Sequence, residues 1–439
     1  MVEAMANSVE DYLIEGLSFK LSPGASYVQD RKQSTFNAIG TQSYVAGTGS
    51  RLIRINLADG NGWLDPSSVR IVFTLTNTDG TNILRTLGGP WSFFRRARCL
   101  FQGAITDDID NYNRTHEMLH ILTTKSNRDN DDVEGFGFRW DDDTHYGYFG
   151  NPGDRDLYNT LAVERSKTVS FKPLLGLFNQ PKYLPLMWGG LVMEFEIVTN
   201  SADCVATFDA SSTLWQISDV KAVCDIVHLD SALQNSYAEH VLGGKALPIN
   251  YSTYISLLQG VAGPNISVNI ARAVTRLNTV FVTLDNNTRG VGQGYNPGQQ
   301  KVARDFNSFY HPMQGVYDFD EEVEYQLQIG GKMIPEYPVR SLSQAFYELK
   351  KALGIHGSAY HSISPSLKMY CDNHFIIGVN CEKILEAGFT GINTKAGQLL
   401  TIKIKGANGT FVTPPDKLYV TLHADNVLEI RDTGCTVFD

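Results

Sequence analysis

The chain has 439 residues and a formal net charge of −10, a length that suits two domains of about 200 residues better than one. Hydrophobic residues make up 42% and charged residues 19%, with 22 Phe, 20 Tyr and 39 Gly, so we expect a mostly β protein of aromatic strands joined by turns. The acidic balance argues against a protein that binds nucleic acid directly through its phosphates, because Lys and Arg supply most of that affinity.

The N-terminal segment shows weak periodicity, and residues 1–45 are expected to form an extended arm. Residues 1–20 lack a basic start followed by an apolar run and a cleavage site, so no standard secretion signal is expected. No stretch of 18 apolar residues occurs along the chain. We therefore expect no membrane span.

After the arm, one set of segments occurs twice in the same order, roughly 210 residues apart. Each set contains two alternating strands, a strand that turns through glycine into a short helix, and two further strands. In the first half these segments are 53–57, 69–77, 100–122, 190–197 and 217–228, and in the second half they are 267–270, 279–286, 328–353, 397–404 and 418–430. The shared order and offset predict two tandem sandwiches of about eight strands.

The duplication predicts an all-β fold in the main, with a short helix inserted in each sandwich. The expected domains after the arm are a first sandwich over 46–229, a helical linker over 230–247 and a second sandwich over 248–439. If the halves are duplicates, strand 71–75 must match strand 280–284, and helix 115–122 must match helix 341–353. Gly103 and Gly331 should lie at matching turns.

Two long polar connections, 123–167 and 286–314, are expected to leave the sandwiches at surfaces. The first holds acidic runs at 129–134 and 141–143 that could bind Ca²⁺. The EF-hand order is missing, because Gly135 comes late and Trp140 stands where the bidentate glutamate belongs. A solvated loop is favoured. We expect this connection to bury its aromatic side chains between loops or subunits, namely Phe136, Phe138, Trp140, Tyr146 and Tyr148.

One motif points to chemistry. His116, Glu117 and His120 form an HExxH sequence, which on a helix places two imidazoles one turn apart to hold Zn²⁺, with the glutamate as general base of a metallopeptidase. Charged Arg114 precedes the motif, and the duplicate helix has no histidine at 341–345. No third ligand is singled out among Glu134 and 141–143. We therefore favour a structural helix with exposed or locally bonded histidines.

Four patches of the sequence resemble one family. They read RRARCLFQGAITDDIDNYNR at 95–114, KYLPL at 182–186, CDIVHLD at 224–230 and YAEHVLGGKALPI at 237–249. Within a likeness that extends over most of residues 51–438, they look like the double jelly-roll major capsid proteins of polinton-like viruses, adintoviruses and virophages, a lineage of double-stranded DNA viruses.

The resemblance implies that both sandwiches are eight-stranded jelly rolls and that the chain is a structural major capsid protein of an icosahedral virus. It implies a homotrimer that forms a pseudo-hexagonal capsomer, with neighbouring capsomers, penton and minor capsid proteins as partners. The protein would reside in the virion capsid after assembly inside the host cell, with both long connections at the outward end of the trimer. It implies no enzyme activity, no catalytic, metal or cofactor residue, and no direct sequence-specific contact with nucleic acid.

Two alternative functions remain, each from a different class of protein. The first is the HExxH zinc metallopeptidase that would use His116, Glu117 and His120. The second is a tandem β-sandwich protein that binds carbohydrate or acts as an adhesin. Such a protein should carry aromatic platforms or calcium ligands in equivalent places of both halves, whereas the aromatic segment 136–140 has no counterpart in the second half.

Overall fold

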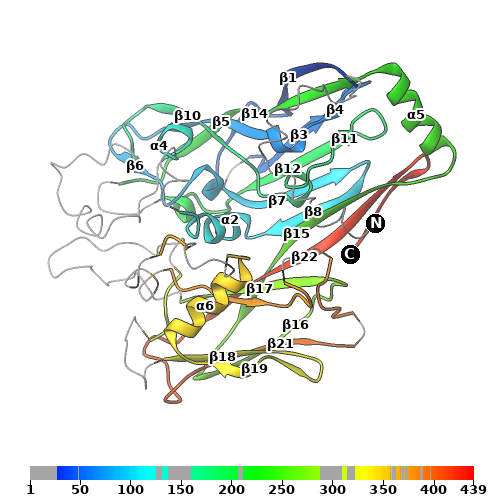
Figure 1. The fold of residues 1–439 in the computed structure, drawn as a ribbon. Helices are drawn as coiled ribbons and strands as arrows, with labels where there is room; N and C mark the ends of the chain where they lie inside the picture. Colours follow the sequence, from blue (N-terminus) through cyan, green and yellow to red (C-terminus); the bar gives the residue numbers. More distant parts are fainter. Residues whose placement is uncertain are drawn as a thin grey trace, which may run out of the picture.

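The computed structural model describes residues 27–47, 49–124, 131–136, 160–205, 211–286, 309–313, 322–355, 357, 362–365, 367, 370, 374–385, 389–395 and 397–439. These residues form two β-sandwiches, drawn one above the other in Figure 1. Each sandwich is built on two antiparallel sheets of four main strands, and one further C-terminal strand joins the second sandwich, so the predicted fold class and its duplication are confirmed. No helix among the described residues is long and apolar enough to cross a membrane.

The first sandwich pairs a sheet of order β10-β5-β14-β1 with a sheet of order β3-β12-β7-β8. Strand β1 bends from one sheet to the other, because Ala38 and Ile39 pair with β3. The strands are β1 (Val28–Ile39), β3 (Leu52–Leu57), β5 (Arg70–Asn77), β7 (Phe94–Phe101), β8 (Ala104–Asp110), β10 (Ser166–Phe171), β12 (Leu191–Ile197) and β14 (Trp215–Leu229). Shorter elements are β2 (Ser43–Tyr44), β4 (Trp63–Leu64), β6 (Ile83–Arg85), β9 (Thr160–Leu161), β11 (Leu184–Pro185), β13 (Ser211–Ser212), α2 (Tyr112–His120), α4 (Asp131–Glu134) and the 3₁₀ turns η1 (Pro66–Ser68), η2 (Pro90–Phe93), η4 (Gly176–Phe178) and η5 (Ser201–Cys204).

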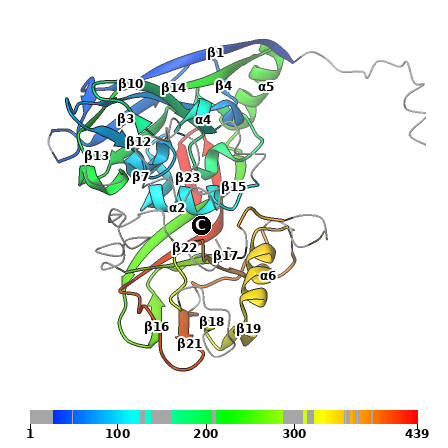
Figure 2. The same ribbon diagram turned by 90° about the vertical axis from the view of Figure 1, so that its left-hand side faces the viewer.

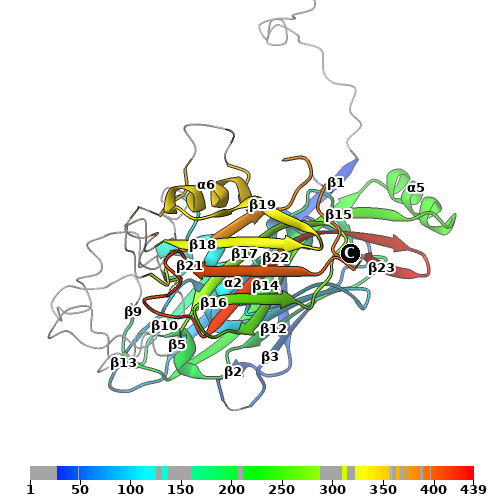
Figure 3. The ribbon, with the colours of Figure 1, turned by 90° about the horizontal axis from the view of Figure 1, so that it is seen from below.

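The second sandwich repeats this plan, with sheets of order β20-β17-β22-β15 and β16-β21-β18-β19. Figure 3 shows the latter sheet from below, with α6 beside it. The strands are β15 (Leu247–Gly260), β16 (Asn265–Ile270), β17 (Leu277–Asp285), β18 (Val323–Ile329), β19 (Lys332–Val339), β20 (Ile377–Asn380), β21 (Leu400–Gly406), β22 (Lys417–Arg431) and β23 (Gly434–Phe438). The helices are α5 (Ser231–Leu242), within the predicted linker, and α6 (Leu342–Ala352).

The two halves match element by element. Each four-strand sheet of the first sandwich has a counterpart of the same order in the second, and α2 and α6 each follow the hairpin that ends it. Both hairpins turn through two residues, with Gln102 and Gly103 in the left-handed region in one and Gly330 in the other. The predicted correspondence of strands, helices and glycine turns is thus confirmed in topology.

Strand β1 lies in the range expected to be an arm. It pairs along most of its length with β14, as β15 pairs with β22 in the other half. By this equivalence Val28–Ile39 is a strand of the first sandwich, one that the sequence-based boundary at residue 45 leaves outside it. Its alternating apolar residues are too few to mark it as a strand from sequence alone.

The alternation of apolar and polar residues explains why most strands have one buried face and one exposed face. In β3, Ile53, Ile55 and Leu57 are buried while the residues between them are exposed, which places one face in the core and the other in solvent. Strand β17 differs, because all nine of its residues are buried. Its outer face must therefore be covered by another part of the chain.

The long connections are described only in part. Phe136 is buried, with 2% of its surface exposed, but it lies in the core of the first sandwich and not between loops or subunits as expected. Phe138, Trp140, Tyr146 and Tyr148 lie outside the described residues. From the second connection, Phe309, Tyr310 and Met313 are buried in the second core.

Candidate functional site

Helix α2 lies between the two sandwiches in both Figures 1 and 2. Its C-terminal half and the residues after it, Met118, Ile121 and Leu122, belong to the core of the second sandwich. In return, Ile249 and Tyr251 of β15 belong to the core of the first. Each half therefore completes the core of the other, and we call this contact the junction.

Arg114 is the polar anchor of the junction. Its guanidinium donates to Thr283 Oγ1 at 3.3 Å and to the Leu284 carbonyl at 3.2 Å, both on β17. It also lies 4.6 Å from the ring centre of Phe309 and 4.4 Å from that of Tyr419. Hydrogen bonds and aromatic faces together stabilise a cation that is only 4% exposed.

Asp107 holds the other side of the junction. This buried carboxylate on β8 accepts from the Gly176 and Leu177 amides at 2.9 and 3.3 Å, and from Thr253 Oγ1 of β15 at 2.6 Å. Burial raises the pKa of Asp107, and these hydrogen bonds oppose that rise. One residue earlier, the Thr106 carbonyl accepts from the Tyr251 hydroxyl at 2.8 Å. Strand β15 is thereby fixed to the first sandwich.

The backbones also come close at Gly176. A Cβ placed on this residue would stand 1.9 Å from the Ser252 carbonyl oxygen of β15. Glycine is required there by space, since its backbone φ is not in the left-handed region. The sequence analysis did not single out Asp107 or Gly176. The signal that could have indicated Asp107 was its position as a charged residue within a predicted strand hairpin.

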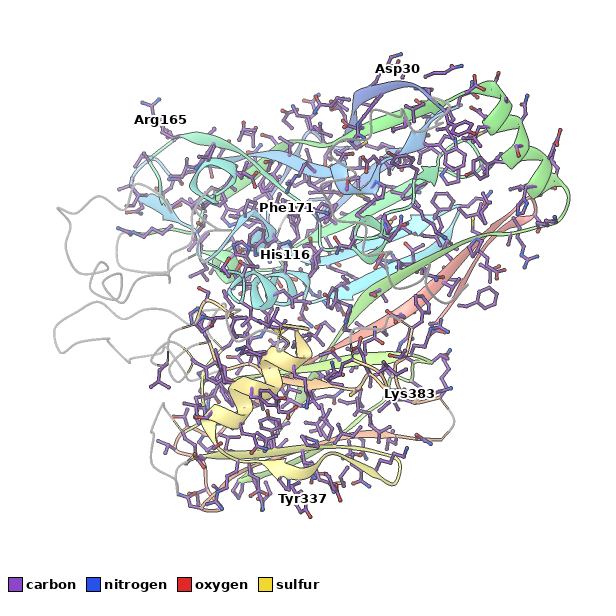
Figure 4. The ribbon with its side chains drawn as sticks, in the orientation of Figure 1. Asp30, His116, Arg165, Phe171, Tyr337 and Lys383 are labelled. Atoms are coloured by element: carbon purple, nitrogen blue, oxygen red, sulfur yellow. The ribbon has the colours of Figure 1, made fainter. Side chains whose placement is uncertain are left out.

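The HExxH motif lies on the side of α2 that faces the first sandwich, where Figure 4 labels His116 near Phe171. The His116 ring stacks on Trp91 with centres 4.0 Å apart, and its Nε2 lies 3.3 Å from the Lys172 carbonyl. His120 meets the same indole edge-on, with centres 4.5 Å apart. Both histidines thus pack locally around one tryptophan.

Glu117 is turned to the same tryptophan. Its carboxylate is fully buried, and Oε2 accepts from the Trp91 indole N–H at 2.5 Å. A metallopeptidase glutamate must instead reach a water beside the metal. Burial, with a smaller effect from His120, lowers the pKa of His116 to about 3. The arrangement suits a neutral, packed imidazole.

The possible third ligands lie apart from this arrangement or outside the described residues. Glu134 is exposed in the one-turn helix α4, and residues 141–143 are not described. Among the described residues, no group of three or more His, Cys, Asp or Glu side chains is placed to hold a metal ion. The acidic runs that could bind Ca²⁺, at 129–134 and 141–143, likewise lie mainly outside the described part of the chain.

No protein-family model matches the sequence, and no curated protein is similar to it. Solved structures do match. The VP54 protein of PBCV-1, fitted into a reconstruction of the virophage Sputnik, has a TM-score of 0.60 at 10% identity, covering 96% of this chain and 99% of that one. The Sputnik virophage structure gives 0.57 at 10%, covering 98% and 92%, and the Faustovirus major capsid protein gives 0.55 at 9%, covering 94% and 92%. The chain is therefore a double jelly roll, as the sequence resemblance implied.

The first prediction concerns the close approach at Gly176. Gly176→Ala should lower the free energy of unfolding by about 1–3 kcal/mol, because the new methyl group forces the two sandwiches apart. Urea unfolding measures this. Gly60→Ala is the control, since a Cβ there meets nothing within 4 Å. Equal stability of the two variants would contradict the packing described.

The second prediction concerns Trp91 and Glu117. Trp91→Phe should cost about 1–3 kcal/mol, because it removes the donor to a buried carboxylate. In a Glu117→Leu background the same change should cost clearly less, so a double-mutant cycle by urea unfolding reports their coupling. Zero coupling, with stoichiometric zinc that is lost in a His116→Ala/His120→Ala variant, would favour the peptidase reading instead.

The third prediction concerns pH. The folded state holds His116 neutral, with a pKa of about 3 against an ordinary 6.5, so the unfolded chain binds the proton first as the pH falls. Stability from this group is complete above pH 6.5 and declines toward pH 3, by about 2 kcal/mol between pH 6.5 and 5. His116→Phe should therefore lose less stability than the parent over that interval. His240→Phe, at an exposed position of α5, should behave like the parent.

Proposed function

We propose that this chain is a structural major capsid protein, forming pseudo-hexagonal homotrimeric capsomers in the shell of an icosahedral double-stranded DNA virus. The observation that carries the proposal is the duplicated double jelly roll, which matches viral capsid proteins over 94–98% of this chain. Three chains of two similar domains supply six similar corners, so one gene product can tile a facet.

The junction supports this role physically. The two sandwiches complete each other's cores and share a buried arginine. They therefore form one rigid unit and not two domains joined by a flexible linker. A shell needs such blocks, because neighbouring capsomers, penton and minor capsid proteins must find their contacts at fixed positions. We place the protein in the virion, after assembly inside the host cell.

The division into domains is part of the same proposal. We propose an N-terminal arm, a first jelly roll that begins with β1 rather than at residue 46, the α5 linker within 230–247, and a second jelly roll over 248–439. The pairing of β1 with β14 supports the earlier start.

We further propose that the HExxH helix is structural and that the chain is not an enzyme. Trp91 packs on His116 and His120 and donates to Glu117, so all three motif residues have local packing roles. For the carbohydrate-binding or adhesive alternative, no specific observation among the described residues speaks in favour.

Surface charge supports an absence of direct nucleic-acid binding. The basic run Arg95, Arg96 and Arg98 lies on β7, where each guanidinium is within 4 Å of a carboxylate on β8 or β12. Its charge is largely compensated before any phosphate approaches.

The fourth prediction is that the purified protein is a homotrimer. Light scattering should give three times the 48.7 kDa chain mass, and negative-stain electron microscopy should show hexagon-like particles. A monomer at all concentrations and salt conditions would overturn the capsomer proposal.

A further inference from the structure

The second sandwich contains a cavity of about 250 Å³ beside the first turn of α6, and we call it the α6 pocket. Figure 1 shows this helix along one side of the sandwich. Besides α6, the pocket is lined by the start of β18 and by connections that contribute His311 and Phe375. A volume of this size holds one small molecule, since a water molecule takes up about 30 Å³ of the liquid. Of the described residues, none from the junction or the HExxH motif lines it.

His311 supplies a buried hydrogen-bond donor to the α6 pocket. Its side chain is 4% exposed, and its Nδ1 accepts from the Met313 amide at 3.2 Å. Burial lowers the pKa of His311 to about 4, so the ring is neutral near pH 7 and carries its proton on Nε2. Among the described residues, none accepts a hydrogen bond from this Nε2. A ligand that brings an acceptor into the pocket is therefore favoured.

Glu322 supplies a hydrogen-bond acceptor from the residue before β18. Its carboxylate forms an ion pair with Arg340 in which Oε2 and Nε are 3.9 Å apart, beyond hydrogen-bonding distance. This Oε2 is buried, and no donor in the described part of the chain reaches it. The ion pair also limits the charge of a ligand, because Arg340 repels a cation and Glu322 repels an anion. The pocket thus suits a neutral group that accepts one hydrogen bond and donates another.

The duplicate positions in the first sandwich indicate the shape of that group. By the registers of β7 with β12 and of β18 with β21, Phe93 corresponds to Glu322. Counted from the helix N-caps, Asn113 corresponds to Ser343. Phe93 is fully buried in the first core, and Asn113, which is 4% exposed, donates from its amide to the Ser92 carbonyl at 3.4 Å. The first sandwich therefore has an aromatic ring and a carboxamide where the second has a carboxylate and a small hydroxyl beside a cavity.

We propose that the α6 pocket binds a small neutral aromatic amide. The amide oxygen accepts from His311 Nε2, and the amide N–H donates to the Glu322 carboxylate. The ring packs against the apolar side of the pocket, which is formed by Leu342, Ala345 and Phe375. Such a ligand supplies to the second sandwich the ring and the carboxamide that the first sandwich has in its own chain.

Binding of this kind connects parts of the fold that are far apart in sequence. His311, Glu322 and the first turn of α6 come together only in the folded second sandwich. The ligand therefore stabilises that sandwich by mass action. The α6 pocket lies within one chain, so the inference goes beyond the proposed capsid function and does not depend on it.

Three probes of similar size and different charge test the site. Benzamide is neutral, benzoate is an anion and benzylammonium is a cation. Crystals of the full chain are soaked in each probe at the same concentration. We expect density for benzamide in the α6 pocket, with its oxygen within hydrogen-bonding distance of His311 Nε2, and no density for either ion. Benzoate or benzylammonium bound there equally well, or a pocket that stays empty with all three probes, would overturn the proposal.

Variants in solution test the two polar contacts, with 4-fluorobenzamide and 4-fluorobenzoate observed by ¹⁹F NMR. His311→Phe keeps a ring but removes the donor, so it should weaken binding of the amide by about tenfold. Glu322→Gln removes the negative charge and should admit the benzoate that the parent protein excludes. Gln344→Asn is the control, because Gln344 is exposed on α6 outside the pocket and should leave both results unchanged.

Thermal unfolding without probe shows whether each variant is folded. The two substitutions report on different contacts, so the proposal stays testable if one of them does not fold. Unchanged affinity for the amide in a folded His311→Phe protein would overturn the assigned donor. Continued exclusion of benzoate by a folded Glu322→Gln protein would overturn the assigned acceptor.

Discussion

The fold depends on covering the outer face of β17. A strand in a sandwich normally exposes one face, yet all nine residues of β17 are buried, because Arg114 of α2 covers this strand at Thr283 and the end of α6 covers it at Thr279. Arg114 can be buried there because Thr283 Oγ1 and the Leu284 carbonyl accept hydrogen bonds from its guanidinium and two aromatic rings cover its faces. Together with the contacts of Asp107 and Gly176 with β15, this contact fixes the orientation of the two sandwiches.

The duplicated helices show how one scaffold supports two roles. In α2, residues on one side bind the second sandwich, and His116, Glu117 and His120 on the other side pack around Trp91. In α6 the corresponding region carries no histidine. The HExxH sequence is thus used for packing. Its two imidazoles and its carboxylate contact the buried indole of Trp91 and do not face a water-filled site.

Proteins can share this fold through strand order and the pattern of inward apolar residues, without sharing much sequence identity. At 9–10% identity, the solved structures still match more than nine-tenths of this chain. What such pairs can share is strand order and the inward apolar residues, such as Ile53 and Ile55 on β3, since a sandwich tolerates any side chains of suitable volume and period. Surfaces are free to change.

The sequence by itself determined the class of fold, its duplication, the two inserted helices and the glycine turns, because alternation, turn chemistry and repeat order are local properties. It left β1 in an arm, because mostly exposed residues carry no periodic signal. Only the tertiary structure decided that Asp107, Gly176 and Arg114 form the junction and that Glu117 contacts Trp91, because these partners are separated in sequence. Trp91 meets Glu117 when the first sandwich folds, whereas Arg114 meets Thr283 only when both sandwiches are folded.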